Sequence, residues 1–295
     1  MKHYQILATA AVFMLLVACD KTQPVADEAP RLIELGAEGD NINASVTTKA
    51  TEVTSLSGFN LTVTKGSSGS EQAVWNNAPF TATGTMTPIT YTGNKFWPAQ
   101  NQSYHFYASN VTMDDATANG VTVSATNDND IVCAFKMTPT FKDRNTLVFE
   151  HIFARLGDVV ITPATGYTIS NVSVSITPNT GGTYAVKTGA GRTDDGGWSN
   201  LTAGSPVQIS GSTCPSTKAN DIYLVPGTYT LTASWQANIN EYERVYTNKT
   251  VNVQLLRGKV NVINATLGGD AEEIKFSVSV NAWTDNTINT TFPVF

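Results

Sequence analysis

Short segments in which apolar and polar residues alternate run through most of this chain. In the clearest of them, Tyr229–Trp235, the odd positions carry Tyr, Leu, Ala and Trp, and the even positions carry Thr, Thr and Ser. Successive side chains of a β-strand point to opposite faces, so this period of two predicts strands with one buried and one solvated face. No segment has the periodicity of an amphipathic helix of three turns. We therefore expect an all-β fold of β-sandwiches with Greek-key connections.

Further alternating segments predict strands on both sides of residue 140. They are Phe59–Val63, Tyr104–Ala108, Leu147–Phe153, Val172–Ile176, Val251–Leu255, Val260–Asn264 and Ile274–Val280. The dipeptide Asn119-Gly120 predicts a hairpin turn, because both residues tolerate positive φ. Arg257-Gly258 predicts another turn, after which Val260, Val262 and Asn264 share one face of a strand.

The N-terminus predicts a bacterial lipoprotein signal. Lys2 supplies a positive charge, Ile6–Val17 form an apolar run, and Leu16-Val17-Ala18-Cys19 ends in a cysteine that can carry lipid. A run of about 12 apolar residues is too short to span roughly 30 Å of hydrocarbon. We therefore expect a signal peptide at residues 1–18 and lipid on Cys19.

The composition is typical of an exported β-rich protein. The chain has 295 residues, of which 14% are charged, and a formal net charge of -6. It lacks the concentration of basic residues that a nucleic-acid-binding surface needs. The length favours two domains.

The segment after Cys19 is expected to hold a tether and one short strand. Residues 20–39 are polar and contain Pro24 and Pro30, which is typical of a flexible tether. The next segment predicts a strand, ending at Thr48-Lys49-Ala50, in which three apolar residues alternate with polar ones: Ile42, Ala44 and Val46.

The last residues of the chain predict a further strand. Ile288, Thr290, Phe292 and Val294 fall on one of its faces, and Pro293 confines it to a sheet edge or a strand end. Two interpretations remain open. The strand completes the local sandwich, or it pairs with another subunit by strand addition.

The cysteines and the acidic clusters also leave alternatives open. Cys133 and Cys214 could form a disulfide outside the cytoplasm, or they could lie apart and never meet. Asp128–Asp130 and Asp194–Gly196 offer oxygen ligands for calcium, but such sequences more often form turns.

The sequence predicts no enzyme and no cofactor or metal. His105 and His151 remain after the signal is removed, and their spacing does not match a metal site. His151 lies in an apolar face and is interpreted as a core or interface histidine. Trp198, which follows two glycines, is the candidate exposed aromatic residue for stacking on a sugar.

A set of further motifs occurs in order along most of the chain. They are Lys95–Pro98 followed by Tyr104–Ala108, then Asp130–Ala134, Leu147–Leu156, Tyr223–Gly227, Leu256–Val260 and Val280–Trp283. In these motifs the chain resembles the fimbrillins, the type V pilus subunits of Bacteroidales. The resemblance implies two transthyretin-like β-sandwiches in tandem, export as an outer-membrane lipoprotein, and assembly into adhesive fibres by donor-strand exchange.

In such an assembly a trypsin-like surface protease removes an N-terminal strand, and a strand of the next subunit fills the groove that is left. The resemblance assigns residues 19–49 to the lipidated tether and removable strand, 50–140 to the N-terminal sandwich, and 141–295 to the C-terminal sandwich. The displaced strand would contain Ile42, Ala44 and Val46, and the donor strand, within 284–295, would contain Ile288, Thr290, Phe292 and Val294.

The cleavage position departs from the family pattern, in which Arg precedes Ala. Here the bond is Lys49-Ala50, and a protease that requires the planar fork of Arg would not recognise the point charge of Lys. Cleavage after Arg31 would leave the strand at 42–47 attached. An uncut chain would keep its lipid, so the alternative function is a surface lipoprotein that does not polymerise: an anchor, or a tip adhesin that binds a glycan or a host protein.

Overall fold

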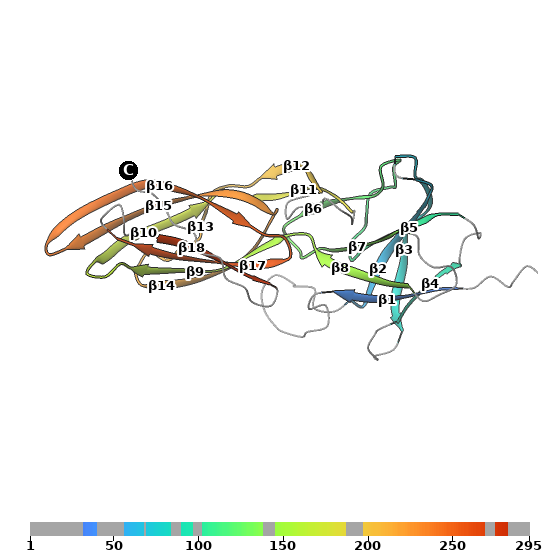
Figure 1. Cartoon of the computed structure of the whole chain (residues 1–295), viewed down its shortest axis with the longest axis horizontal. Helices are drawn as coiled ribbons and strands as arrows, with labels where there is room; N and C mark the ends of the chain where they lie inside the picture. The colour runs from blue at the N-terminus through green and yellow to red at the C-terminus, as the bar shows by residue number, and fades with distance from the viewer. Residues whose placement is uncertain are drawn as a thin grey trace, which may run out of the picture.

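The structure is a computed structural model that describes residues 32–39, 56–67, 69–83, 90–96, 102–137, 145–186, 197–268 and 275–282. Across these residues the chain is all-β, which confirms the predicted fold class. The molecule is elongated, with a β-barrel at one end and a β-sandwich at the other (Figure 1). None of the described segments forms a helix of the length and hydropathy needed to cross a membrane.

Seven strands close into the barrel, in the order β1-β4-β3-β2-β5-β7-β8. β8 closes the ring by pairing in parallel with β1, and the other neighbours are antiparallel. The strands are β1 (Leu32–Gly39), β2 (Gly58–Lys65), β3 (Gln72–Thr83), β4 (Thr90–Phe96), β5 (Tyr104–Ser109), β7 (Val132–Met137) and β8 (Asn145–His151). The N-terminal strands, expected to form a sandwich, close into a barrel because β1 pairs on both of its sides.

The alternating residues of β2 and β5 fill the barrel as their pattern predicts. Phe59 of β2 stacks on Phe80 of β3 with ring centroids 5.8 Å apart, and Phe106 of β5 is fully buried beside them. β5 is buried on both faces, because Tyr107 belongs to a second apolar cluster. This second cluster also contains Phe153, which lies just beyond the barrel, and we call it the junction cluster.

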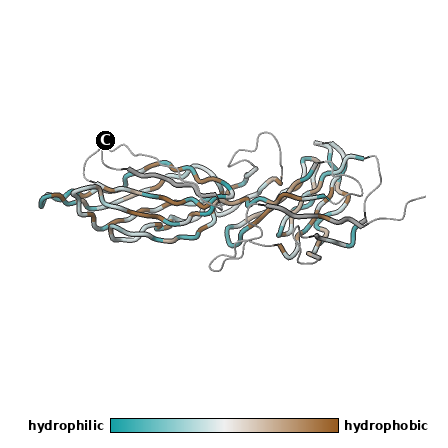
Figure 2. Tube along the Cα trace, turned by 60° about the horizontal axis from the view of Figure 1, so that its bottom comes forward, coloured by the Kyte–Doolittle hydropathy of each residue, from teal (hydrophilic) through white to brown (hydrophobic). Residues whose placement is uncertain are grey.

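Two four-stranded sheets form the sandwich, in the orders β13-β10-β15-β16 and β14-β9-β17-β18. Apolar residues of both sheets share one core, and Figure 2 shows hydrophobic and hydrophilic residues alternating along these strands. The strands are β9 (Ala154–Pro163), β10 (Thr168–Ile176), β13 (Val207–Gln208), β14 (Ser216–Leu224), β15 (Gly227–Ile239), β16 (Tyr242–Leu255), β17 (Lys259–Leu267) and β18 (Lys275–Ala282).

A third, three-stranded sheet interlaces the two halves of the chain. Its order is β12-β11-β6, with β6 at Thr122–Thr126, β11 at Asn179–Ala185 and β12 at Trp198–Ala203. β6 comes from between two barrel strands, and β11 and β12 come from between two sandwich strands. The domain boundary between residues 140 and 141 stays a prediction. β8 lies on its C-terminal side in sequence, yet pairs with β7 and β1 of the barrel.

The prediction of a tether at residues 20–39 is wrong for the last part of this segment, since Leu32–Gly39 form β1. The composition of this segment is polar, but β1 hydrogen-bonds to strands on both sides, and Leu35 enters the barrel core. Backbone pairing on two sides stabilises a strand whose side chains alone predict little.

In β17 the buried face is the one opposite Val260, Val262 and Asn264. Asn261 is fully buried, and Ile263 shares its face. Asn261 can be buried because its amide nitrogen donates to the carbonyl oxygens of residues 155, 256 and 259, and its Oδ1 accepts from the backbone N–H of residue 256. Burying such a fully hydrogen-bonded amide costs little free energy, because its hydrogen bonds to water are replaced by hydrogen bonds within the protein.

Candidate functional site

The closing strand β1 is the part of the barrel with the clearest functional potential. On one side Leu32 pairs with Phe96 and Leu35 with Tyr91 of β4. On the other side Leu35–Gly39 pair in parallel with Asn145–Phe149 of β8. The Leu35 side chain is 0% exposed and lies in the barrel core.

We call the two ladders that β1 makes with β4 and β8 the β1 seam. In the barrel order, β1 is the only neighbour that separates β4 from β8 among the described strands. Removing it would leave a row of unpaired N–H and C=O groups on each of these strands and an empty position where Leu35 lay. Such a groove recognises an extended strand through backbone hydrogen bonds and apolar contacts.

The site residues predicted from the sequence lie outside the described residues, and their roles stay predictions. They are Cys19, Arg31, Ile42, Ala44, Val46, Lys49, Ala50, Ile288, Thr290, Phe292 and Val294. In sequence, Arg31 directly precedes β1, and the Lys49-Ala50 bond falls between β1 and β2. The sequence did not identify β1 itself, for which the short apolar group Leu32-Ile33 and Leu35 was the available signal.

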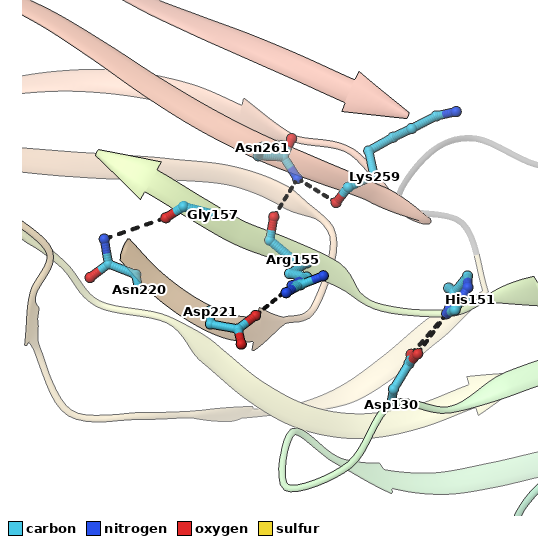
Figure 3. A network of polar contacts seen from close by, with 8 residues as sticks. All are labelled: Asp130, His151, Arg155, Gly157, Asn220, Asp221, Lys259 and Asn261. Carbon is cyan, nitrogen blue, oxygen red and sulfur yellow. Dashed lines mark hydrogen bonds and ion pairs between the residues drawn. The ribbon is translucent and has the colours of Figure 1, made fainter. Parts of the chain in front are cut away.

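A buried histidine–carboxylate contact lies at the barrel side of the junction. His151, at the end of β8, places Nδ1 at 2.8 Å from Oδ2 and 3.0 Å from Oδ1 of Asp130, and both side chains are buried (Figure 3). This agrees with the interpretation of His151 as a core or interface histidine. The carboxylate holds the imidazole ring in one orientation, so the pair has a structural role at the junction.

Arg257 makes a connection across the junction. It lies in the turn between β16 and β17, and its Nη1 donates to Tyr184 Oη at 2.8 Å. Its Nη2 lies 3.3 Å from Glu150 Oε2 of β8. One guanidinium therefore connects the sandwich, the interlacing sheet and the barrel.

Another ion pair lies on the sandwich side of the junction. The guanidinium of Arg155, which follows the start of β9, donates through Nε to Asp221 of β14 (Figure 3). Asn220 beside it donates to Gly157 O at 3.5 Å and to Ile209 O at 2.9 Å. These contacts fix β14 against β9 where their pairing is irregular.

A buried carboxylate lies on the outer side of the barrel, against the faces of β2 and β5 that point away from the barrel core. Glu71 Oε2 accepts hydrogen bonds from Tyr107 Oη at 2.7 Å and from the hydroxyl of Thr64, and Oε1 lies 3.2 Å from His105 Nδ1. Burial, together with the hydrogen bond and the negative charge of Glu71, raises the pKa of Tyr107 well above its usual range. Gly120, with φ of 102°, passes so close that a Cβ there would lie 3.0 Å from Tyr107 Oη.

Trp198 is not the exposed sugar platform that its glycine neighbours suggested. Its ring packs against Phe153 with centroids 5.0 Å apart and against Tyr184 at 5.3 Å. Its Nε1 donates to Ile152 O at 3.2 Å. Pairing of β12 with β11 turns the indole toward the junction cluster, a long-range contact that local sequence does not reveal.

The two remaining cysteines are not joined by a disulfide. Cys133 lies in the junction cluster, whereas Cys214 packs at the sandwich core. Across the described part of the chain, no group of three or more His, Cys, Asp or Glu side chains is arranged to hold a metal ion.

Comparison with solved structures finds similar chains in species of Bacteroides and Parabacteroides. A candidate cell adhesion protein of Parabacteroides distasonis is 10% identical, with a TM-score of 0.53 and coverage of 86% of this chain and 96% of that one. A candidate cell adhesion protein of Bacteroides uniformis is 17% identical, with a TM-score of 0.46 and coverage of 86% and 98%. A fimbrial assembly protein of Parabacteroides distasonis is 11% identical, with a TM-score of 0.45 and coverage of 88% and 99%.

At these identities the likeness concerns the fold alone, and no curated protein matches the chain. The family model gives the stronger result, because it matches one continuous span that includes barrel, interlacing sheet and sandwich. This span, residues 38–283, matches the model described as fimbrillin-like, and the chain therefore belongs to the fimbrillin-like family.

Proposed function

We propose that this chain is a fimbrial subunit that is exported as a lipoprotein and polymerises by exchanging β1 for a strand of another copy. The fibres would lie at the bacterial outer surface and serve cell adhesion. Family membership supports this function, and so does the likeness to a candidate cell adhesion protein of Parabacteroides distasonis. The observation that carries the proposal is the β1 seam.

β1 is suited to removal because of its place in the chain. It is the first described strand, and residues 40–55 are its only covalent link to the rest of the barrel. Cleavage at Lys49-Ala50 would detach β1, the predicted strand at 42–47 and the lipid on Cys19 in one step. Cleavage after Arg31 would leave β1 attached, so it would release the lipid without opening the seam.

Exchange at the opened seam would be favourable. The predicted donor strand offers three apolar side chains, Ile288, Phe292 and Val294, to the position that Leu35 occupies in the barrel core, and each buried apolar side chain stabilises by roughly 1.5–3 kcal/mol. Head-to-tail donation is a heterologous contact that does not close, and such contacts generate a fibre. The mature subunit would begin at Ala50 and retain β2–β18.

Limited trypsin treatment of the full-length chain tests this function. We expect a product that begins at Ala50 and forms ladders on denaturing gels that disappear on boiling. Lys49→Gln should abolish both the product and the ladders, whereas the matched variant Lys49→Arg should keep both. A product that begins at Ala50 and stays monomeric would contradict polymerisation, and a chain that resists cleavage would support the alternative of a capped surface lipoprotein.

A further inference from the structure

The turn between β15 and β16 carries an unusual residue. Asn240 and Glu241 join these strands, with φ of 49° and 70°. Positive φ at both central residues is the geometry of a type I′ hairpin turn, for which Asn-Gly is the favoured pair. A glutamate in this backbone region is strained, since its Cβ crowds the following carbonyl. The chain therefore accepts a less stable turn that carries a carboxylate.

This turn lies at one pole of the molecule. β15 pairs with β16 from Gly227 and Leu255, near the junction, to Ile239 and Tyr242 beside the turn. The 13 residues of β15 span roughly 40 Å at the usual rise of a strand. Figure 1 shows the β15–β16 turn at the left end of the molecule, farthest from the barrel.

The side chains next to the turn are exposed. Tyr242 is 77% exposed and Val245 is 66% exposed, and Glu243 between them is also exposed. Two carboxylates, the guanidinium of Arg244 and two apolar side chains therefore belong to this exposed pole, which we call the hairpin pole. A surface of this kind combines the charge and the apolar area that a protein contact uses.

A polar pocket lies at the other end of the molecule. It has a volume of about 350 Å³, and its lining includes Lys65, Ser67, Ser70, Gln72, Gln102 and Ser103. Among the described residues Lys65 is the only charged one in the lining, and the serines and glutamines offer hydroxyl and amide groups. An ammonium group surrounded by hydrogen-bond donors is suited to a carboxylate.

The pocket faces away from the junction. Lys65 pairs with Tyr104 at the start of β5, whereas Ser109 at the end of β5 pairs with Cys133 of the junction cluster. In Figure 1 the connection between β2 and β3 lies with the barrel, on the side away from the sandwich. The chain therefore presents a carboxylate at one pole and a receptor for a carboxylate toward the other.

We infer that Glu241 of one copy docks into the Lys65 pocket of the next copy, with Tyr242 packing on the rim. The occupant is a second copy because the two complementary surfaces lie toward opposite ends of one elongated chain. Their contact is head-to-tail and repeats in a single direction. The inference rests on the proposed function, since this contact would set the spacing and direction of subunits along the fibre, in addition to strand exchange.

A carbodiimide, which couples a carboxylate to an amine only where the two touch, tests the contact on the full-length chain. A mixture of isotopically light and heavy chains distinguishes coupling between copies from coupling within one. We expect a mixed-isotope amide between Lys65 and Glu241, roughly tenfold more abundant than any other Lys–Glu amide between copies, if the pair contributes one decade of affinity. Lys65→Arg, which keeps the charge, should keep the association but lose this amide.

Charge exchange supplies the second test. Lys65→Glu and Glu241→Lys should each weaken association of the variant with itself, and a mixture of the two variants should restore it, because each chain then meets an opposite charge. Glu241→Gly should raise the melting temperature by roughly 2 °C as strain is relieved, yet weaken association. This opposite pair of effects separates a contact residue from a structural one.

The outcomes separate this inference from the proposed function. Ladders after trypsin treatment without the Lys65–Glu241 amide would overturn the pole contact and leave strand exchange standing. The amide without ladders would support the contact and count against strand exchange. Saturable binding of glucuronate to the pocket, with no association between copies, would overturn the second copy as the occupant.

Discussion

His151 Nδ1 lies 2.8 Å from Asp130 Oδ2 at the point where β8 leaves the barrel. Both side chains are buried, and the strand that follows begins the sandwich. The pair therefore connects the end of β8 to the segment before β7, beside the start of the sandwich.

Asp130→Ala should lower the free energy of unfolding by about 3 kcal/mol, because it removes the carboxylate from beside a buried imidazole. Urea denaturation followed by tryptophan fluorescence measures the change. Asp128→Ala is the matched control: Asp128 is an exposed residue of the same turn that accepts a hydrogen bond from Thr126, and its loss should cost no more than about 0.5 kcal/mol. Equal losses of stability in the two variants would contradict a special role of the buried pair.

Leu35→Ala should destabilise the barrel by about 2–5 kcal/mol, the usual cost of a cavity left by a buried leucine. Hydrogen exchange of the β8 amides should also speed up, since β8 pairs with β1 at this position. Leu201→Ala, at a leucine that is 49% exposed, should have little effect. If Leu35→Ala changes stability as little as this control does, the burial of Leu35 does not hold β1 in the barrel.

The Tyr107 hydroxyl should make stability depend on alkaline pH. Its pKa is raised in the folded state by burial and by Glu71, so the protonated hydroxyl stabilises the fold fully below the unfolded pKa of about 10. As the pH rises above 10, the unfolded chain ionises first and this contribution is lost. Tyr107→Phe should therefore be less stable at pH 7, by about 1–3 kcal/mol, with a gap that narrows above pH 10.

Denaturation curves collected between neutral and alkaline pH would show this convergence. Tyr229→Phe provides a comparison, because burial also raises the pKa of Tyr229, whose hydroxyl donates to Val225 O at 2.5 Å. The double variant should have the shallowest dependence of the three. Parallel curves for the wild type and Tyr107→Phe would contradict the proposed linkage.

Strands with a clear period of two were predictable from the sequence, and the reason is local. In β15, Tyr229, Leu231, Ala233 and Trp235 are buried as their alternation predicts. Each face of such a strand meets one uniform environment, apolar on one side and solvent on the other. Alternation within a few residues is then sufficient to assign the strand and its faces.

Features that depend on distant partners were not predictable in this way. β1 is held by ladders to strands that follow it by more than fifty residues, and it lies at the end of a longer polar segment that predicts a tether. The buried face of β17 is set by carbonyl groups around Asn261, and the place of Trp198 is set by the pairing of β12 with β11. The residues predicted for cleavage and strand donation, Lys49 and Ile288 among them, lie outside the described residues.

The direct passage from β8 into β9 has a mechanical consequence. Only Ile152 and Phe153 separate the two strands, both are fully buried, and the strands run along the long axis of the molecule (Figure 1). In the uncut chain, tension on the sandwich would pass along this backbone into β8 and load its parallel ladder with β1 in shear. Hydrogen bonds loaded in shear share the force instead of opening one after another. Such a subunit would therefore resist mechanical unfolding when it is pulled along its long axis.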